Sequence, residues 1–360
     1  MAYRLIGALM ALVIAPLAAR AETPPTMRAL LVGVSDYLYL DADLRGPRND
    51  VRLMRDILVA RGVAPDQITV LSQDNTAPTR AAILGALDYV AAHSGPGDQV
   101  LFYFSGHGTQ APDVSGDEMG GFDEIFLPAD AKGWSDSSRS VENAIYDDEF
   151  QVKAASITAT GAKLVVILDA CHAATGFRAL GGQGVARTVS PETLNIPDAP
   201  GAMAMVAAPP LTGDFVFLYA AQADERAFEY PLGAEEDPAN WYGGFTRALA
   251  QTLRSTPDLT WQQAMQVVQA SIRAAGGSQT PDAEGPLLGA PVFGTAIPPP
   301  PRIEMRGTVL QAGLLAGLQR GAEMAVYADP TSQNVVARGV ISGIDARSAV
   351  LKITEGAAPK

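Results

Sequence analysis

Cysteine and histidine are nearly absent from this chain, which has one cysteine and three histidines among 360 residues. A single cysteine excludes an internal disulfide, and so few cysteines and histidines argue against a zinc cluster. Basic residues are also scarce, with 26 Lys and Arg against 39 Asp and Glu, for a net charge of −13. This deficit argues against nucleic acid or an anionic membrane surface as the main partner, since both attract basic patches.

Long apolar runs are missing beyond the N-terminus, so no later segment is expected to span a bilayer. The first 21 residues resemble a secretory leader. Arg4 precedes the apolar stretch LIGALMALVIAPLAA, and Ala19 and Ala21 provide small residues for a cleavage site. Pro16 interrupts the stretch, which argues against a membrane-spanning helix. An uncleaved membrane anchor is the alternative. We expect an exported protein, periplasmic or secreted, with a signal peptide at residues 1–21.

Apolar, β-branched runs alternate with helical patterns over residues 27–294. Continuous apolar strands separated by amphipathic helices predict an α/β domain, with a mostly parallel sheet covered by helices on both faces. The strands are expected at 28–34, 67–71, 98–108, 163–172 and 214–222, and helices at 47–62, 79–95, 242–254 and 259–275. A Pro-rich linker is expected at 295–302 and a small all-β module at 303–360. The non-periodic stretches 109–145 and 173–213 are expected to be loops or disordered.

Two of the expected strands end in residues that suggest chemistry. The third ends in FSGHG, with His107, and the next ends in LDACH, with Cys171. Parallel strands share one carboxyl edge, so these side chains are expected to meet there. An imidazole can take the proton of a thiol nucleophile, and the N–H groups of Gly108 and Cys171 can stabilise an oxyanion. The alternative is a buried thiol beside a capping histidine.

These two segments resemble the His and Cys boxes of the caspase superfamily, and more closely those of bacterial metacaspase-type cysteine peptidases. GDEMGGFDEIFLPAD, GFTRALAQTL and SQTPDAEG also resemble segments of that family, so the likeness covers about residues 27–294. The resemblance implies a caspase-like fold and a thiol protease, a cysteine-type endopeptidase (hydrolase). Cys171 would be the nucleophile and His107 the general base. It further implies protein or peptide substrates, a monomer, and no cofactor required for the chemistry.

The resemblance also assigns a specificity pocket. Asp169 and Asp50 match its acidic residues, and two carboxylates there favour Arg or Lys before the scissile bond. From the residues alone, Asp169 is equally a strand-end carboxylate bonded to backbone amides, and Asp50 a charge at a helix N-terminus. Arg45 and Arg48 lie close to Asp50 in the sequence and are candidates to neutralise it.

The stretch 173–213 resembles the segment where this superfamily is often cut. A pocket for basic residues predicts self-cleavage after Arg178 or Arg187, whereas a pocket for acidic residues predicts Asp198. Two alternatives to the proteolysis after Arg or Lys stay open. One is a caspase-like peptidase with acidic specificity, and the other is a non-catalytic caspase-fold scaffold or binding protein.

Several metacaspases need calcium as an activator, and IYDDEF matches the family's paired aspartates. Asp147 and Asp148 are therefore candidate calcium ligands, with Asp123 as a third, since carboxylates suit this cation. The sequence departs from the family pattern after the nucleophile, where CHAATGFRAL offers Arg178 in place of an expected aspartate. The alternative is an acidic, solvated loop in which Asp147 and Asp148 cap a helix.

Overall fold

The computed structural model describes residues 25–113, 121–171, 184–197, 209–222, 224–232, 234–255, 258–294, 302–314, 318–330, 332 and 334–357. The predicted signal peptide, nearly all of the predicted linker, Arg178 and Asp198 lie outside these residues. Among the described helices, none is long and apolar enough to cross a membrane.

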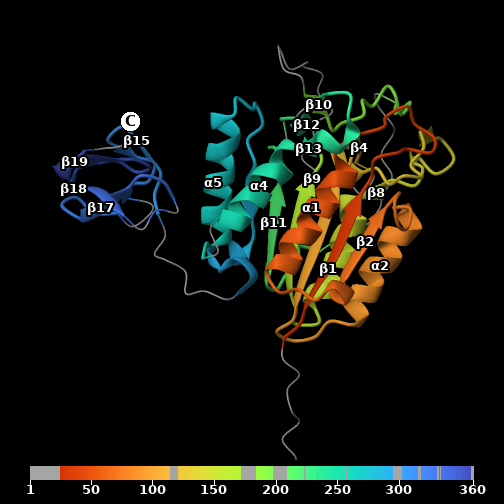
Figure 1. The fold of residues 1–360 in the computed structure, drawn as a ribbon, viewed down its shortest axis with the longest axis horizontal. Coiled ribbons are helices and arrows are strands. Elements are labelled where there is room, and N and C mark those ends of the chain that lie inside the picture. The colour runs from red at the N-terminus through yellow and green to blue at the C-terminus, as the bar shows by residue number, and fades with distance from the viewer. Residues whose placement is uncertain are drawn as a thin grey trace, which may run out of the picture.

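Six strands form the central sheet, in the order β14-β11-β9-β3-β1-β2 (Figure 1). They are β1 Met27–Gly33, β2 Ile68–Ser72, β3 Gln99–Ser105, β9 Lys163–Asp169, β11 Phe215–Tyr219 and β14 Asp282–Glu284. Neighbouring strands run parallel except β11 and β14, which are antiparallel. The predicted mostly parallel sheet is therefore confirmed.

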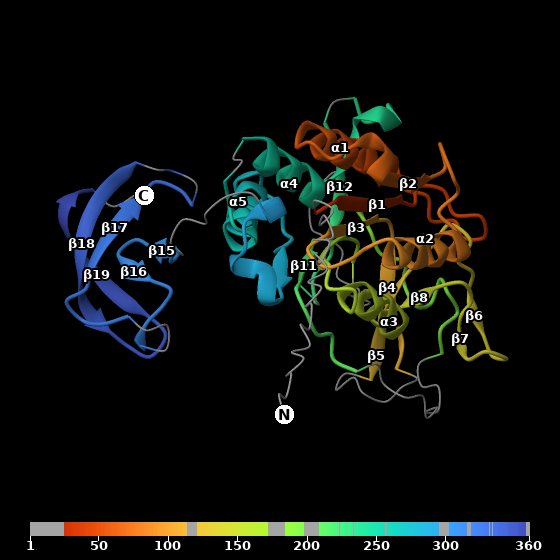
Figure 2. The same cartoon turned by 90° about the horizontal axis from the view of Figure 1, so that it is seen from below.

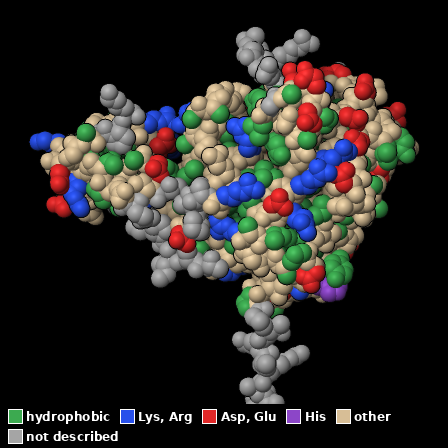
Figure 3. Space-filling view, viewed as in Figure 1, with side chains coloured by type: hydrophobic (Ala, Val, Ile, Leu, Met, Phe, Trp, Pro, Cys, Tyr) green, Lys and Arg blue, Asp and Glu red, His purple; other side chains and the backbone are tan. Residues whose placement is uncertain are grey.

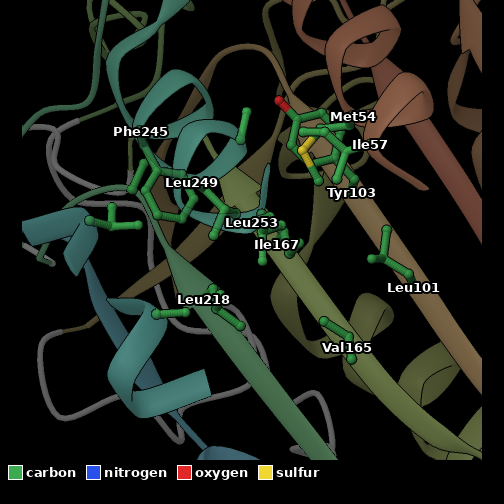
Figure 4. Packing of buried hydrophobic residues seen from close by; sticks show 14 of the residues in the cluster. Met54, Ile57, Leu101, Tyr103, Val165, Ile167, Leu218, Phe245, Leu249 and Leu253 are labelled. Atoms are coloured by element: carbon green, nitrogen blue, oxygen red, sulfur yellow. The ribbon is translucent and has the colours of Figure 1, made fainter. Parts of the chain in front are cut away.

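Helices cover both faces of this sheet, as predicted (Figure 2). One face packs against α1 Pro47–Ala60, α4 Gly244–Ser255 and α5 Trp261–Ala274, and the other against α2 Arg80–Ala92 and α3 Asp147–Thr158. Successive strand residues point to opposite faces, so alternate apolar residues supply two separate cores. Figure 4 shows the first core, where Met54 and Ile57 of α1 and Phe245 of α4 surround Tyr103 and Ile167 of the sheet.

Short strands surround the carboxyl edge of the sheet. β4 Gly108–Pro112, β5 Phe122–Phe126 and β8 Ile145–Tyr146 pair with one another, as do β6 Trp134–Ser135 and β7 Ser140–Val141. A third small sheet joins β10 Val185–Ala186, β12 Phe228–Pro231 and β13 Trp241–Gly243. Single 3-10 turns lie at Pro65–Gln67, Pro238–Asn240, Pro286–Gly289 and Val292–Gly294.

The prediction that 109–145 is a loop or disordered is wrong, because β5, β6 and β7 fall within it, together with most of β4 and the first residue of β8. Strands of two to five residues carry too few side chains to display a period, and pairing partners fix them instead.

The C-terminal residues form the predicted all-β module. Its antiparallel strands are β15 Met305–Arg306, β16 Val309–Leu310, β17 Glu323–Tyr327, β18 Val335–Ile344 and β19 Ala349–Gly356. They enclose a small core of their own, which includes Leu310, Ile341 and Leu351. In Figures 1 and 2 this sheet lies to the side of α5, away from the carboxyl edge of the central sheet.

Candidate active site

The carboxyl ends of β3 and β9 bring His107 and Cys171 to one place. The two strands pair in register, with Ser105 opposite Asp169 at their last residues. His107 and Cys171 each follow two residues later, as the shared edge of a parallel sheet requires.

Cys171 is fully buried, and its thiol contacts Ala227, the residue that precedes β12. The Sγ accepts the backbone N–H of Ala227 at 3.0 Å and donates to the Ala227 carbonyl at 3.4 Å. Burial raises the pKa of the thiol to about 12. In this arrangement the cysteine is therefore a neutral thiol, held by backbone groups.

His107 is buried and has one ring nitrogen free. Its Nε2 lies 2.8 Å from the carbonyl oxygen of Ala42, which only accepts, so Nε2 carries the proton. Nδ1 has no hydrogen-bond partner among the described residues. Burial lowers the pKa of the imidazole to about 4, so the ring is neutral at neutral pH and Nδ1 presents a lone pair. The backbone N–H of His107 donates to the Tyr37 hydroxyl at 2.8 Å, which fixes this turn.

A segment of the chain itself lies across the two boxes. β10 pairs antiparallel with β12, and the next residue, Arg187, donates its N–H to the Ala227 carbonyl at 2.9 Å. The Arg187 carbonyl oxygen accepts from the backbone N–H groups of Gly108 at 3.3 Å and Cys171 at 3.2 Å. These are the two groups predicted to stabilise an oxyanion. A side chain at Gly108 would collide with the Cys171 carbonyl, so this approach requires glycine.

The Arg187 side chain fills the predicted acidic pocket. Its guanidinium is fully buried, with Nη2 2.6 Å from Asp50 Oδ2 and Nη1 3.1 Å from Asp169 Oδ2. Nη1 also donates to Ser105 Oγ at 2.8 Å. Burial outweighs the attraction of this cation and raises the pKa of Asp50 to about 6. The Asp50 carboxyl group therefore sits where burial disfavours its charge and the guanidinium partly compensates for that effect.

Backbone amides also bind the two pocket carboxylates, and Asp50 lies in the first turn of α1. Asp169 Oδ2 accepts the N–H of Thr246 at 3.0 Å, and Asp50 accepts the N–H of Gly243 at 3.0 Å. These backbone bonds hold both carboxylates toward the guanidinium.

Neither neighbouring arginine neutralises Asp50. Arg48 pairs with Asp36 at 2.8 Å and with Asp74 at 3.4 Å, and Arg45 lies over the Trp241 ring at 4.9 Å. Figure 3 shows basic side chains interleaved with acidic ones on the viewed face. The counter-charge of Asp50 comes instead from Arg187, 137 positions away in the sequence.

Three further residues of this site were not predicted from the sequence. Ser105 bridges Arg187 and Asp50, Ala227 binds both the thiol and Arg187, and Glu229 lies 3.4 Å from Arg187 Nη2. Ser105 could have been found, since it lies inside the FSGHG segment, two residues before His107. Nothing in the local pattern around Ala227 and Glu229 distinguishes them from other strand residues.

The predicted calcium ligands lie on β5 and α3. Asp123 is buried on β5, while Asp147 begins α3 and accepts the N–H groups of Asp148 at 2.8 Å and Glu124 at 3.2 Å. Burial raises the pKa of Asp147 to about 6. Within the described part of the chain, no group of three or more His, Cys, Asp or Glu is placed to hold a metal ion. Calcium therefore stays a prediction.

Comparisons with known proteins point to one family. The profile described as "Caspase domain" matches residues 26–289. Metacaspase-1 of Mycosarcoma maydis is 34% identical over 154 residues, which are 42% of this chain and 36% of that protein. Metacaspase-2 of Arabidopsis thaliana is 35% identical over 153 residues, which are 41% of this chain and 34% of that protein. The match thus spans about a third of the length of these relatives.

A solved structure also shares the fold. The crystal structure of protein GSU0716 from Geobacter sulfurreducens aligns with a TM-score of 0.51 at 19% identity, covering 73% of this chain and 96% of that one.

Proposed function

Because this chain belongs to the caspase domain family, we propose that it is a cysteine endopeptidase of metacaspase type that cleaves after arginine or lysine through a Cys171–His107 dyad. One observation carries the proposal. Arg187 lies in the site as a substrate residue would, with its side chain against Asp50 and Asp169 and its carbonyl on two N–H donors. An aspartate in that pocket would meet carboxylates, which disfavours acidic specificity.

In the first half of the reaction, Cys171 Sγ attacks the carbonyl carbon of the residue in the pocket, and a carbon–sulfur bond forms. His107 Nδ1 takes the thiol proton during the attack, because burial disfavours a thiolate formed in advance. The oxyanion is held by the N–H groups of Gly108 and Cys171. The carbon–nitrogen bond then breaks, and His107 gives the proton to the departing amine.

In the second half, water attacks the resulting thioester while His107 Nδ1 takes a proton from it. The carbon–sulfur bond breaks, the cysteine recovers its proton from His107, and a carboxylic acid leaves. The Arg187 side chain then competes with outside substrates for the pocket. Self-cleavage between Arg187 and Thr188 is the first reaction that this site is arranged to perform.

The experiment compares the chain without residues 1–21 with its Cys171→Ala variant. We expect the parent to yield a new terminus at Thr188 by mass spectrometry and to cleave reporter peptides ending in Arg or Lys. The alternative cut, after Arg178, would appear in the same map. Cys171→Ala should do neither. Cleavage after Asp would support the acidic alternative, and a folded parent that cuts nothing would support the scaffold.

Two further expectations from the sequence are tested alongside. Parallel reactions with calcium and with a chelator decide whether Asp123, Asp147 and Asp148 serve an activating ion. Export is tested with the full chain in a bacterial host. A periplasmic or secreted product beginning at Glu22 supports a cleaved leader, whereas a membrane-bound product that keeps residues 1–21 supports the anchor.

A further inference from the structure

A third carboxylate, Glu229, lines the pocket that holds Arg187. It lies on β12, is 1% exposed, and has Oε2 3.4 Å from Arg187 Nη2. The backbone N–H groups of Arg45 at 2.9 Å and Gly46 at 3.0 Å donate to its two oxygens. The segment before α1 therefore fixes the carboxylate in place.

The two terminal nitrogens of the guanidinium meet separate sets of acceptors. Nη1 donates to Ser105 Oγ at 2.8 Å and pairs with Asp169 Oδ2 at 3.1 Å. Nη2 pairs with Asp50 at 2.6 Å and with Glu229 at 3.4 Å. Asp169 thus pairs with Nη1, whereas Asp50 and Glu229 share Nη2. Glu229 has a cation beside it only when the side chain in the pocket carries a nitrogen at the Nη2 position.

Two glycines let the backbone approach the terminal nitrogens of the guanidinium closely. A Cβ placed on Gly46 would lie 2.6 Å from Arg187 Nη2, and one on Gly243 would lie 2.7 Å from Nη1. Backbone therefore approaches both nitrogens more closely than any side chain would permit. The pocket is thus closely fitted to two separated nitrogens, which a guanidinium has and a lysine ammonium lacks.

We infer that Glu229 is a specificity-determining residue that makes this pocket select arginine over lysine before the scissile bond. The inference rests on the proposed peptidase function. A lysine ammonium is a single point charge, so a position between Asp50 and Asp169 leaves Glu229 buried without its cation. A guanidinium pairs with all three carboxylates and is also the more weakly hydrated cation, so it loses less hydration free energy on entering a buried pocket.

The test measures kcat/KM for matched peptides ending in Arg and in Lys. We expect the parent to prefer Arg by about tenfold or more, equivalent to about 1.4 kcal/mol. Glu229→Gln should bring the ratio close to one by slowing the Arg peptide while the Lys peptide changes little. Glu229→Asp keeps the charge but places the carboxylate farther from the guanidinium, so it should also lower the ratio.

Glu225→Gln is the matched control. Glu225 also accepts a backbone N–H, that of Thr280, but makes no contact with Arg187. The ratio of kcat/KM for the Arg and Lys peptides in Glu225→Gln should equal that of the parent. A parent that cleaves Arg and Lys peptides equally well overturns the inference. An equal loss for both peptides in Glu229→Gln and Glu229→Asp does so too, because it reports a purely structural role.

A binding measurement separates this inference from the proposed function. In the Cys171→Ala chain, Arg187→Ala empties the pocket so that fluorescent peptides ending in Arg or Lys can bind. Arg should bind about tenfold more tightly than Lys, and Glu229→Gln should remove that difference. If the parent cleaves nothing, the proposed function fails, and this comparison still decides the role of Glu229. Equal affinities before the Glu229 substitution overturn the inference.

Discussion

The buried guanidinium of Arg187 predicts a large effect on stability. The perturbation is Arg187→Met in a Cys171→Ala chain, where self-cleavage cannot interfere. Methionine keeps an unbranched apolar side chain of similar reach but no charge. It leaves Asp50 and Asp169, now 2.6 and 3.1 Å from guanidinium nitrogens, without their shared cation in a fully buried site.

The magnitude follows from burial. Removing one partner of a buried ion pair costs about 3–5 kcal/mol, against about 0–1 kcal/mol for an exposed pair. Because the pKa of Asp50 is already raised to about 6, protonation offsets part of this cost at low pH. We expect a loss of about 3 kcal/mol at pH 7 and a smaller loss at pH 5.

Urea unfolding at the two pH values measures the difference. Lys153→Met is the control, because Lys153 pairs with Asp88 at 2.6 Å, as short as the buried pair, but the Asp88 side chain is 59% exposed. The reasoning is refuted if Arg187→Met costs less than about 1 kcal/mol at pH 7, or no more than Lys153→Met does.

The remaining predictions concern the same site. Burial raises the pKa of Asp50, to about 6 with Arg187 docked, which predicts that kcat/KM for Arg peptides rises with pH above the ordinary range of an aspartate, because only the carboxylate binds the cation. Asp50→Asn should remove this limb of the pH profile. For stability the sign is opposite: a folded pKa above the ordinary value means that the contribution of Asp50 to the free energy of unfolding falls as pH rises from about 4 to about 6, which urea titrations across that range measure. Gly243→Ala places a Cβ 2.7 Å from the docked guanidinium and should abolish self-cleavage on gels, whereas Gly85→Ala, which meets nothing within 4 Å, should not. Tyr37→Phe leaves the buried N–H of His107 without its acceptor and should lower the free energy of unfolding by about 1–3 kcal/mol in calorimetry; an unchanged value contradicts that role.

Most of the central domain was readable from local patterns. Val165 to Leu168 form a continuous apolar run, which is typical of an internal parallel strand, and all four residues are buried. Helix α1 was predicted from apolar residues at helical spacing, and Met54 and Ile57 on that face are buried. The short strands between β3 and α3 were missed, because pairing with neighbours rather than side-chain period defines them.

By itself, the sequence determined five strands of the sheet, four of the helices that cover it, and the placement of His107 and Cys171 at one edge, because side-chain periodicity and the shared carboxyl edge of parallel strands can be recognised in the sequence. Strand β14 and helix α3 were not among the expected elements. Only the tertiary structure decided what fills the acidic pocket. Asp50 had charged neighbours in Arg45 and Arg48, yet its cation is Arg187, and the third carboxylate comes from Glu229 on another strand. A buried charge is stabilised by the opposite charge that the fold places next to it, and the local sequence pattern does not show which distant residue provides that charge.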